Sequence, residues 1–337
     1  MELTERMLIR LEHFGIGYVY VDDPRTDDIV FKDVISAETR ARAVSEVRTH
    51  FRKMMDDGCR KLSVSNIQLG KAFRSIVDLI IDELGGNTDA MAMLLNLDAS
   101  DHYLFQHSVN VCIYSTILGQ AHGYSREELS MLGLGSLLHD IGKTKIPNEV
   151  LQKPGKLTAE EYDIVKRHAE IGFKMLKDVP NIPLVSAHIA FQHHERINGS
   201  GYPRGILGGE MQEFSKWVSI ADSYDAMTSN RVYRSAMLPH EAMEIIYTGA
   251  GTLYDVEKIR LFRDKIAIYP IGIVVGLSTG ETGVVVDINS AFPQRPIVRI
   301  LSDLDGRPLK APYEVDLSKK LNINVSMVSY SNVNVPV

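Results

Sequence analysis

The chain has few of the features that would place it in an oxidising or membrane setting. Its 337 residues include only two cysteines, Cys59 and Cys112, which stand far apart. This spacing provides neither a disulfide framework nor a cysteine metal site, and it favours a reducing compartment. No run approaches the roughly 18 apolar residues of a membrane span. The charged N-terminal segment MELTERMLIRLEH does not resemble a signal peptide, so we expect a cytoplasmic protein without membrane contact.

Basic charge is also in deficit. The 37 Lys and Arg residues are outnumbered by 43 Asp and Glu residues, and the formal net charge is −6. The chain as a whole therefore has no attraction for nucleic-acid polymers or anionic membranes. An anionic ligand must instead be bound by a local group of basic side chains.

Three segments with different patterns predict a mainly α protein. Residues 1–88 combine a short hairpin at about 14–34 with two amphipathic helices, which predicts a small α+β N-terminal module of unknown role. Residues 89–264 are helical almost throughout and predict a helical bundle. Residues 265–337 alternate Val- and Ile-rich runs with Gly, Pro and Ser, which predicts a small all-β C-terminal domain.

Two capping boxes mark helix starts within the predicted bundle. Ser125 stands three residues before Glu128, and Thr158 stands three residues before Glu161. In this motif the hydroxyl and the carboxylate each accept a hydrogen bond from the other residue's backbone N–H group. We therefore expect helices to begin just after Ser125 and just after Thr158.

Several histidines and aspartates stand in apolar helical stretches of the bundle. Taken singly, each would more often be a packed polar residue of the core than a metal ligand. Taken together on separate helices, they are hard to bury without a cation, and helical bundles build two-metal sites from such side chains. Mixed imidazole and carboxylate donors suit Fe, Mn, Zn or Ni better than Ca or Mg. The residues are His107, His139, Asp140, His168, His193, His194 and Asp222.

These residues fall within separated motifs that occur in a definite order. The motifs are His107, HDIGK at 139–143, His168, HHE at 193–195, GSGYP at 199–203 and SIADSYDAMTSNRVYR ending at Arg234. Over about 100–250, half of the chain, they resemble the HD-GYP subgroup of the HD-domain phosphohydrolases. The resemblance implies an HD-type helical bundle as the catalytic domain, and it leaves the flanking segments unexplained.

The resemblance also implies two divalent cations that share Asp140. The first would be held by His107, His139, Asp140 and Asp222, and the second by Asp140, His168, His193 and His194. Some family members hold a third cation through a glutamate one turn before the first histidine. This chain has Tyr103 there, so we expect two cations, with Fe or Mn as their identity. A pair of cations about 3.5–4 Å apart activates water and binds the attacked phosphate.

The family motifs further suggest roles near the centre of the site. Lys143 lies one turn after His139, and we expect it to bind a phosphate oxygen or protonate the leaving group. The alternative is a solvated lysine that stabilises a helix end. Asp225 lies one turn after Asp222, and we expect it to position Lys143 or relay a proton. Glu195 is expected to orient one imidazole from outside the ligand set.

The remaining candidates concern the substrate. Tyr202, followed by Pro203, is expected to form a rigid edge against the substrate or a partner. Arg231 and Arg234 match basic positions that contact substrate phosphate or guanine in the family, since a guanidinium suits both. Their alternative reading is ordinary surface charge.

The resemblance implies a phosphodiesterase of bacterial second-messenger signalling. We expect hydrolysis of a cyclic dinucleotide, first of all cyclic di-GMP, to linear pGpG and then to GMP. Alternatives are an enzyme that prefers cyclic GMP-AMP and a non-catalytic cyclic-dinucleotide receptor. A mononucleotide phosphohydrolase ranks last, because it has no use for the segment HHERINGSGYP. A signalling protein that binds the GYP loop and a homodimer are the partners that we consider.

Overall fold

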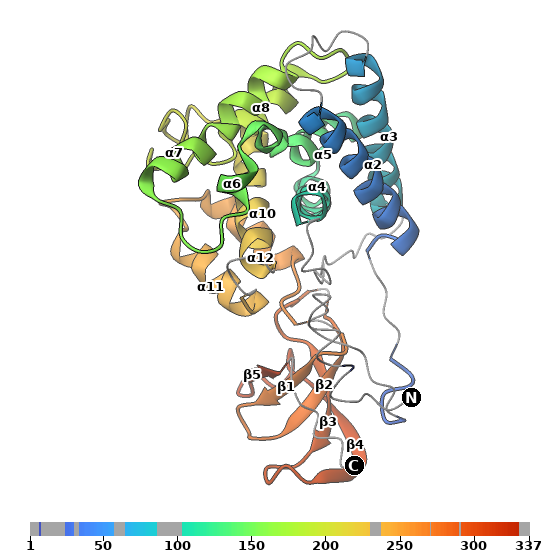
Figure 1. The fold of residues 1–337 in the computed structure, drawn as a ribbon. Helices are drawn as coiled ribbons and strands as arrows, with labels where there is room; N and C mark the ends of the chain where they lie inside the picture. The colour runs from blue at the N-terminus through green and yellow to red at the C-terminus, as the bar shows by residue number, and fades with distance from the viewer. Residues whose placement is uncertain are drawn as a thin grey trace.

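The computed structural model describes residues 7, 24–29, 34–56, 65–85, 103–229, 237–269, 271–289 and 291–329. Helices make up the larger, upper part of the molecule in Figure 1, and strands make up the lower part. The predicted class, mainly helical with a small all-β C-terminal part, is confirmed. The hairpin predicted at about 14–34 lies almost wholly outside the described residues.

The helical part consists of eleven α-helices and one 3-10 helix among the described residues. They are α2 (Ala37–Asp56), α3 (Ser65–Gly85), α4 (Tyr103–His122), α5 (Arg126–Leu138), η1 (Ile141–Lys145), α6 (Asn148–Leu151), α7 (Ala159–Lys166), α8 (His168–Leu176), α9 (Leu184–Gln192), α10 (Glu213–Thr228), α11 (Pro239–Thr248) and α12 (Val256–Lys265).

Both predicted capping boxes are present. The Ser125 hydroxyl accepts a hydrogen bond from the backbone N–H of Glu128, whose carboxylate accepts one from the backbone N–H of Ser125. Thr158 and Glu161 repeat this arrangement at the start of α7. Each box satisfies backbone donors that a helix start leaves unpaired, so local sequence determines where α5 and α7 begin.

The two N-terminal helices pack directly on the bundle. Phe51 of α2 lies edge-on to Phe73 of α3 and to Phe105 of α4, with ring centroids 6.3 and 6.0 Å apart. All three rings belong to one hydrophobic core that extends through α4, α5 and α10. The boundary predicted near residue 88 remains a prediction, because residues 86–102 lie outside the described part of the chain.

The C-terminal part is one antiparallel sheet with the strand order β4-β3-β2-β1-β5. Its strands are β1 (Val274–Leu277), β2 (Thr282–Asp287), β3 (Ile297–Ser302), β4 (Pro308–Asp316) and β5 (Val325–Ser329). The STGET segment joins β1 to β2 as the predicted hairpin, with Val275 opposite Gly283. The buried face of the sheet, which includes Val285 and Ile300, belongs to the same hydrophobic core as the helices.

A turn at residues 24–29 is bound to this sheet by a charged contact. The guanidinium of Arg299 on β3 forms a two-pronged ion pair with Asp28, with N–O distances of 2.5 and 2.7 Å. It also donates to the backbone carbonyl of Arg25 and to the carboxylate of Glu314. This turn, drawn in blue beside the strands in Figure 1, is thus tied to the C-terminal sheet.

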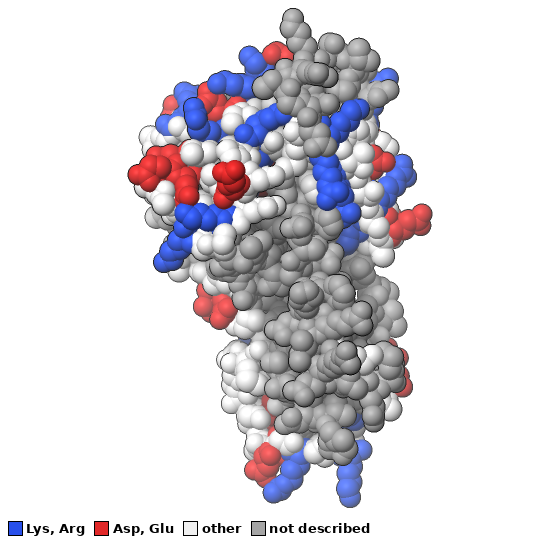
Figure 2. Space-filling view, viewed as in Figure 1, with Lys and Arg blue, Asp and Glu red and all other residues white. Residues whose placement is uncertain are grey.

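The surface shows mixed charge over the helices. In the view of Figure 2, Lys and Arg spread over the helical half with Asp and Glu interspersed among them. No helix in the described ranges combines the length and apolarity needed to cross a membrane.

A close backbone contact holds η1 against α8. A Cβ atom on Gly142 would lie 2.0 Å from the backbone oxygen of His168 and 2.7 Å from the backbone nitrogen of Gly172. Both neighbours are main-chain atoms and have little freedom to move. Only glycine therefore allows the segment that carries Asp140 to approach the start of α8 this closely.

The substitution Gly142→Ala should separate η1 from α8. We expect the free energy of unfolding to fall by about 1–3 kcal/mol or more, as for other overpacked cores. Urea titration followed by circular dichroism measures this change. Gly209→Ala is the matched control, because a Cβ atom there meets no atom within 4 Å. Equal stability of the two variants would contradict the proposed steric role of Gly142.

Candidate metal centre

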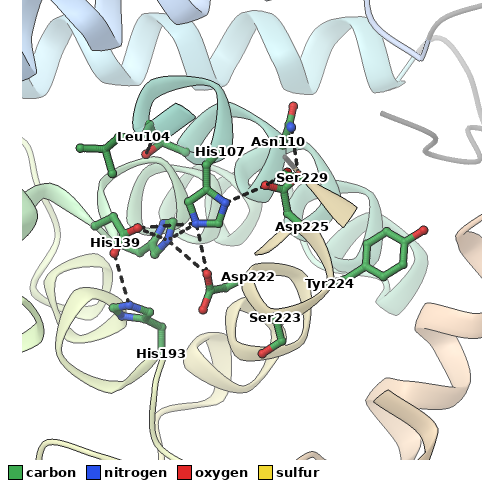
Figure 3. Close-up of polar contacts among 12 residues, drawn as sticks. Leu104, His107, Asn110, His139, His193, Asp222, Ser223, Tyr224, Asp225 and Ser229 are labelled. Carbon is green, nitrogen blue, oxygen red and sulfur yellow. Dashed lines mark hydrogen bonds and ion pairs between the residues drawn. The ribbon is translucent and has the colours of Figure 1, made fainter. Parts of the chain in front are cut away.

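The structure brings together all seven residues predicted as metal ligands. They lie mainly at helix ends: His139 caps the C-terminus of α5, Asp140 the N-terminus of η1 and His193 the C-terminus of α9. The others are His107 within α4, His168 at the start of α8, His194 after α9 and Asp222 within α10. Figure 3 shows His107, His139, His193 and Asp222 directed toward a common centre.

The potential ligand atoms form two groups that share Asp140. One comprises Asp140, His168, His193 and His194, and the other His107, His139 and Asp140, with the atoms of each group within 4.8 Å of one another. Asp140 Oδ2 lies 3.5 Å from His107 Nε2 and 3.4 Å from His139 Nε2. Asp140 Oδ1 lies 3.4 Å from His168 Nε2 and 3.8 Å from His193 Nε2. The carboxylate thus faces one group with each oxygen.

Asp222 adjoins the first group and also reaches toward the second. Its Oδ1 atom lies 3.1 Å from His107 Nε2 and 3.8 Å from His139 Nε2. Its Oδ2 atom lies 3.7 Å from His194 Nδ1. The centre therefore combines buried imidazoles with two carboxylates, a donor set that suits transition metals.

Hydrogen bonds to backbone carbonyls orient three of the imidazoles. His139 Nδ1 lies 2.7 Å from Ser136 O, His168 Nδ1 lies 2.6 Å from Val165 O, and His193 Nδ1 lies 3.1 Å from Ile189 O. A carbonyl oxygen only accepts, so each Nδ1 atom must carry the proton. In the neutral rings each Nε2 atom is then unprotonated and its lone pair points into the centre, as in metal-ligating histidines.

This orientation creates a contact that needs a cation. The Nε2 atoms of His168 and His193 face each other at 3.3 Å, and two lone pairs at that distance repel. Asp140 Oδ1, beside both, is buried without a hydrogen-bond partner. Leaving such a group unpaired in the interior is costly. The residues present therefore fit a divalent cation, which would accept all three lone pairs.

The electrostatics of the second group favour neutral histidines. Burial lowers the pKa of His168 to about 4. Burial and the neighbouring imidazoles hold the pKa of both His193 and His194 well below the usual range. Only the unprotonated imidazole binds a metal, so these rings are ready to act as ligands near neutral pH.

The carboxylates are held in their ionised form. Burial opposes ionisation of Asp140, but the ammonium group of Lys143 keeps its pKa well below the usual range. Burial likewise opposes a charge on His107, yet Asp222 and Asp225 raise its pKa to about 9. The carboxylates of Asp222 and Asp225 thus stabilise positive charge at His107, and a bound cation would provide such a charge.

Comparisons with known proteins agree with the predicted family. Residues 91–257 match the family model of the HD domain. The chain belongs to the HD domain family. Residues 274–332 match the family model of a KOW domain associated with the HD domain, and this range contains the entire sheet. The family inferred from the motifs is confirmed.

Relatives of known activity match parts of the chain. A cyclic di-GMP phosphodiesterase of Pseudomonas aeruginosa is 33% identical over 244 residues, which cover 71% of this chain and 59% of that protein. A 3'3'-cGAMP-specific phosphodiesterase of Vibrio cholerae is 40% identical over 157 residues, which cover 47% of this chain and 36% of that protein. The matched region thus spans three fifths or less of these relatives.

A solved structure supports the fold. The structure of Bd1817, an HDG"Y"P protein from Bdellovibrio bacteriovorus, matches with a TM-score of 0.51 and 20% sequence identity. The match covers 77% of this chain and 79% of that one. It shows that the two proteins share an overall architecture.

The HD domain places Lys143 against the shared carboxylate. Its Nζ atom lies 2.5 Å from Asp140 Oδ2, and its side chain is 18% exposed. The ammonium group is therefore at the edge of the centre and within reach of solvent. Arg231 and Arg234 lie outside the described residues, as does the side chain of Tyr103. Their predicted roles remain predictions.

Asp225 contacts His107 and not Lys143, so the predicted positioning of Lys143 is wrong, while the alternative role in proton relay remains a prediction. The Oδ2 atom of Asp225 accepts a hydrogen bond from His107 Nδ1 at 2.7 Å and one from the Ser229 hydroxyl. Asp225 follows Asp222 by one helical turn, and Figure 3 shows its carboxylate beside His107 of α4. Asp225 thus supports the orientation of His107.

Asn110, which sequence reasoning missed, completes this support. Its Nδ2 atom donates to Asp225 Oδ1 at 2.9 Å, while its Oδ1 atom accepts from Gln106 and from Arg40 of α2, each at 3.3 Å. The two donors on Oδ1 determine the amide orientation. Arg40 thus connects α2, through Asn110 and Asp225, to the candidate ligand His107. The available signal was the helical period, since Asn110 follows His107 by three residues.

Glu195 also differs from its predicted role. Its carboxylate does not contact an imidazole; it accepts hydrogen bonds from the backbone N–H groups of Arg204 and Ile206 at 2.8 and 3.2 Å. Glu195 is fully buried, so it anchors the loop after GYP from inside. The reason is that His193 Nδ1 already finds carbonyl oxygens within its own helix.

The GYP loop closes over the histidines. A Cβ atom on Gly201 would lie 2.4 Å from the backbone nitrogen of Arg196, so glycine is required for the loop to pass this closely. Tyr202 stacks on His194 with ring centroids 4.6 Å apart, and the Tyr202–Pro203 peptide bond is cis. Tyr202 thus forms an aromatic edge at the partly exposed ligand of the second group.

The substitution Asp225→Asn should weaken metal binding. An amide has one acceptor oxygen, so either the His107 N–H or the Asn110 amide would face another donor. We expect the affinity for Mn²⁺ to fall roughly 10- to 100-fold, as for other residues that orient ligands. Calorimetric titration of metal-free protein measures this affinity. The exposed Asp178→Asn is the control, and wild-type affinity in Asp225→Asn would refute the assignment.

Proposed function

We propose that the chain is a metal-dependent phosphodiesterase that hydrolyses a cyclic dinucleotide, cyclic di-GMP in the first place. The observation that carries the proposal is the pair of ligand groups joined by Asp140. A centre of this kind suits hydrolysis of phosphate esters, because both the attacking and the leaving oxygen need positive charge nearby. The matched relatives act on cyclic di-GMP or on 3'3'-cGAMP.

The proposed ligand assignment follows the two groups. His107, His139 and Asp222 would hold one divalent cation, and His168, His193 and His194 the other, with Asp140 between them. Fe or Mn is the proposed identity, since the donors are imidazole and carboxylate without thiolate. When bound, two such cations lower the pKa of water and polarise the phosphate.

The side chains around the centre have separate tasks in this proposal. The facing carbonyls and Asp225 keep the imidazoles in the orientation that points Nε2 inward. Lys143 provides an ammonium group at the exposed edge, where it donates to a phosphate oxygen or protonates the leaving oxygen. Tyr202 of the GYP loop stacks on His194 and offers an aromatic surface to the substrate.

A preference for cyclic GMP-AMP is the second candidate, because a relative specific for 3'3'-cGAMP matches the chain at 40% identity. Guanine and adenine differ at the base edges, which the metal centre does not touch. Competition between the two cyclic dinucleotides in one assay distinguishes the candidates. A receptor without activity is less well supported, since recognition alone has no need of two ligand groups.

The substitution Asp140→Ala should abolish metal binding and activity together. It removes the carboxylate that both groups share, so neither cation retains its ligands. We expect elemental analysis of anaerobically purified protein to show loss of metal and chromatography to show intact cyclic di-GMP. The wild-type protein should contain up to two Fe or Mn ions per chain. Normal turnover by the variant would refute the ligand assignment.

The substitution Lys143→Ala should lower activity but leave metal binding intact. Metal content should be retained, because an ammonium group is not a ligand, whereas kcat should fall by about 10²–10³-fold through loss of a charged donor. Steady-state assays beside elemental analysis measure both. Lys156→Ala, an exposed lysine, serves as control. An unchanged kcat in Lys143→Ala would limit Lys143 to a structural role.

A further inference from the structure

Arg196 is held rigidly beside the candidate metal centre. Its guanidinium group lies over the ring of Tyr254, 5.0 Å from the ring centroid. Its Nη2 atom donates to the Ser223 hydroxyl at 3.3 Å, and the Tyr254 hydroxyl donates to the same Ser223 oxygen at 2.8 Å. Stacking and hydrogen bonding together restrict a side chain that is usually flexible.

No carboxylate among the described residues pairs with this guanidinium. Arg299 and Arg126, by contrast, form ion pairs with acidic side chains at 2.5 Å. The nearest acid in the sequence, Glu195, directs its carboxylate to backbone N–H groups of the following loop. Arg196 is also half-buried, so it is partly desolvated without a counter-ion. A guanidinium in this state favours binding of an anion.

Arg196 and its partner Ser223 each lie close in sequence to a candidate ligand. It follows His194 by two residues, and its partner Ser223 follows Asp222 directly. Figure 3 shows Ser223 on the same helix as Asp222, with its side chain directed away from the histidine cluster. Arg196 thus lies outside the ligand groups, two residues after His194, whose side chain is 19% exposed.

A cyclic dinucleotide brings two negative charges to this region. Its ring contains two phosphodiester groups, and only one is cleaved in a given step. The scissile group would occupy the centre beside Lys143, which leaves the second group charged and in need of a separate cation. We propose that Arg196 binds this second, non-scissile phosphate; the inference rests on the proposed function. The planar guanidinium presents parallel N–H donors that match two phosphate oxygens.

The test compares substrates with two phosphates and with one. Arg196→Ala should lower kcat/KM for cyclic di-GMP roughly 10- to 100-fold, mostly through KM, because hydrogen bonds to charged groups contribute that much. Bis(p-nitrophenyl) phosphate has a single phosphate, and its hydrolysis should fall far less. Arg196→Lys should restore part of the loss, since it keeps the charge without the planar donors. Metal content should match that of wild type.

Arg167→Ala is the matched control. Arg167 also adjoins a candidate ligand, His168, but its side chain is exposed. Equal losses on both substrates in Arg196→Ala would overturn the proposal by assigning Arg196 to the scissile phosphate. An unchanged KM for cyclic di-GMP would overturn it as well. If wild-type protein cleaves bis(p-nitrophenyl) phosphate but neither binds nor cleaves cyclic dinucleotides, the proposed function itself fails, and this inference fails with it.

Discussion

The interior of this protein holds imidazole lone pairs that face one another around a buried carboxylate. His168 and His193 point unprotonated nitrogens at each other across 3.3 Å, beside an oxygen of Asp140 that has no hydrogen-bond partner. Packing of apolar side chains cannot compensate such an arrangement, because each lone pair loses its hydration on burial. Cations satisfy it directly. The surrounding scaffold can be understood as the structure needed to keep these nitrogens in place.

That scaffold relies on close backbone contacts and on orienting hydrogen bonds. Gly142 and Gly201 let η1 and the GYP loop approach their neighbours where a Cβ atom would collide with main-chain atoms. Backbone carbonyls and Asp225 orient the imidazole rings from outside. The support extends through Asn110 to Arg40 of α2. The N-terminal helix therefore belongs to the framework of the centre and packs in the same hydrophobic core.

Two basic side chains near the centre, Lys143 and Arg196, have different surroundings. Lys143 is paired with the carboxylate that both ligand groups share. Arg196 is stacked on an aromatic ring and has no acidic partner among the described side chains. Under the proposed function, these two side chains would let a chain with a net charge of −6 present positive charge to a phosphate ester.

The sequence by itself determined the helix starts at Ser125 and Thr158, the change to strands near the C-terminus, and the set of side chains that meet in the centre. These follow from short-range hydrogen bonding, residue periodicity and motif order. Tertiary structure alone decided the partners of Asp225 and Glu195. Sequence spacing was compatible with a contact from Asp225 to Lys143 and from Glu195 to an imidazole, but helix packing gave both carboxylates other partners. Tertiary structure also decided that Arg196 has no carboxylate partner among the described residues, since pairing between distant segments depends on how helices pack and leaves no local pattern.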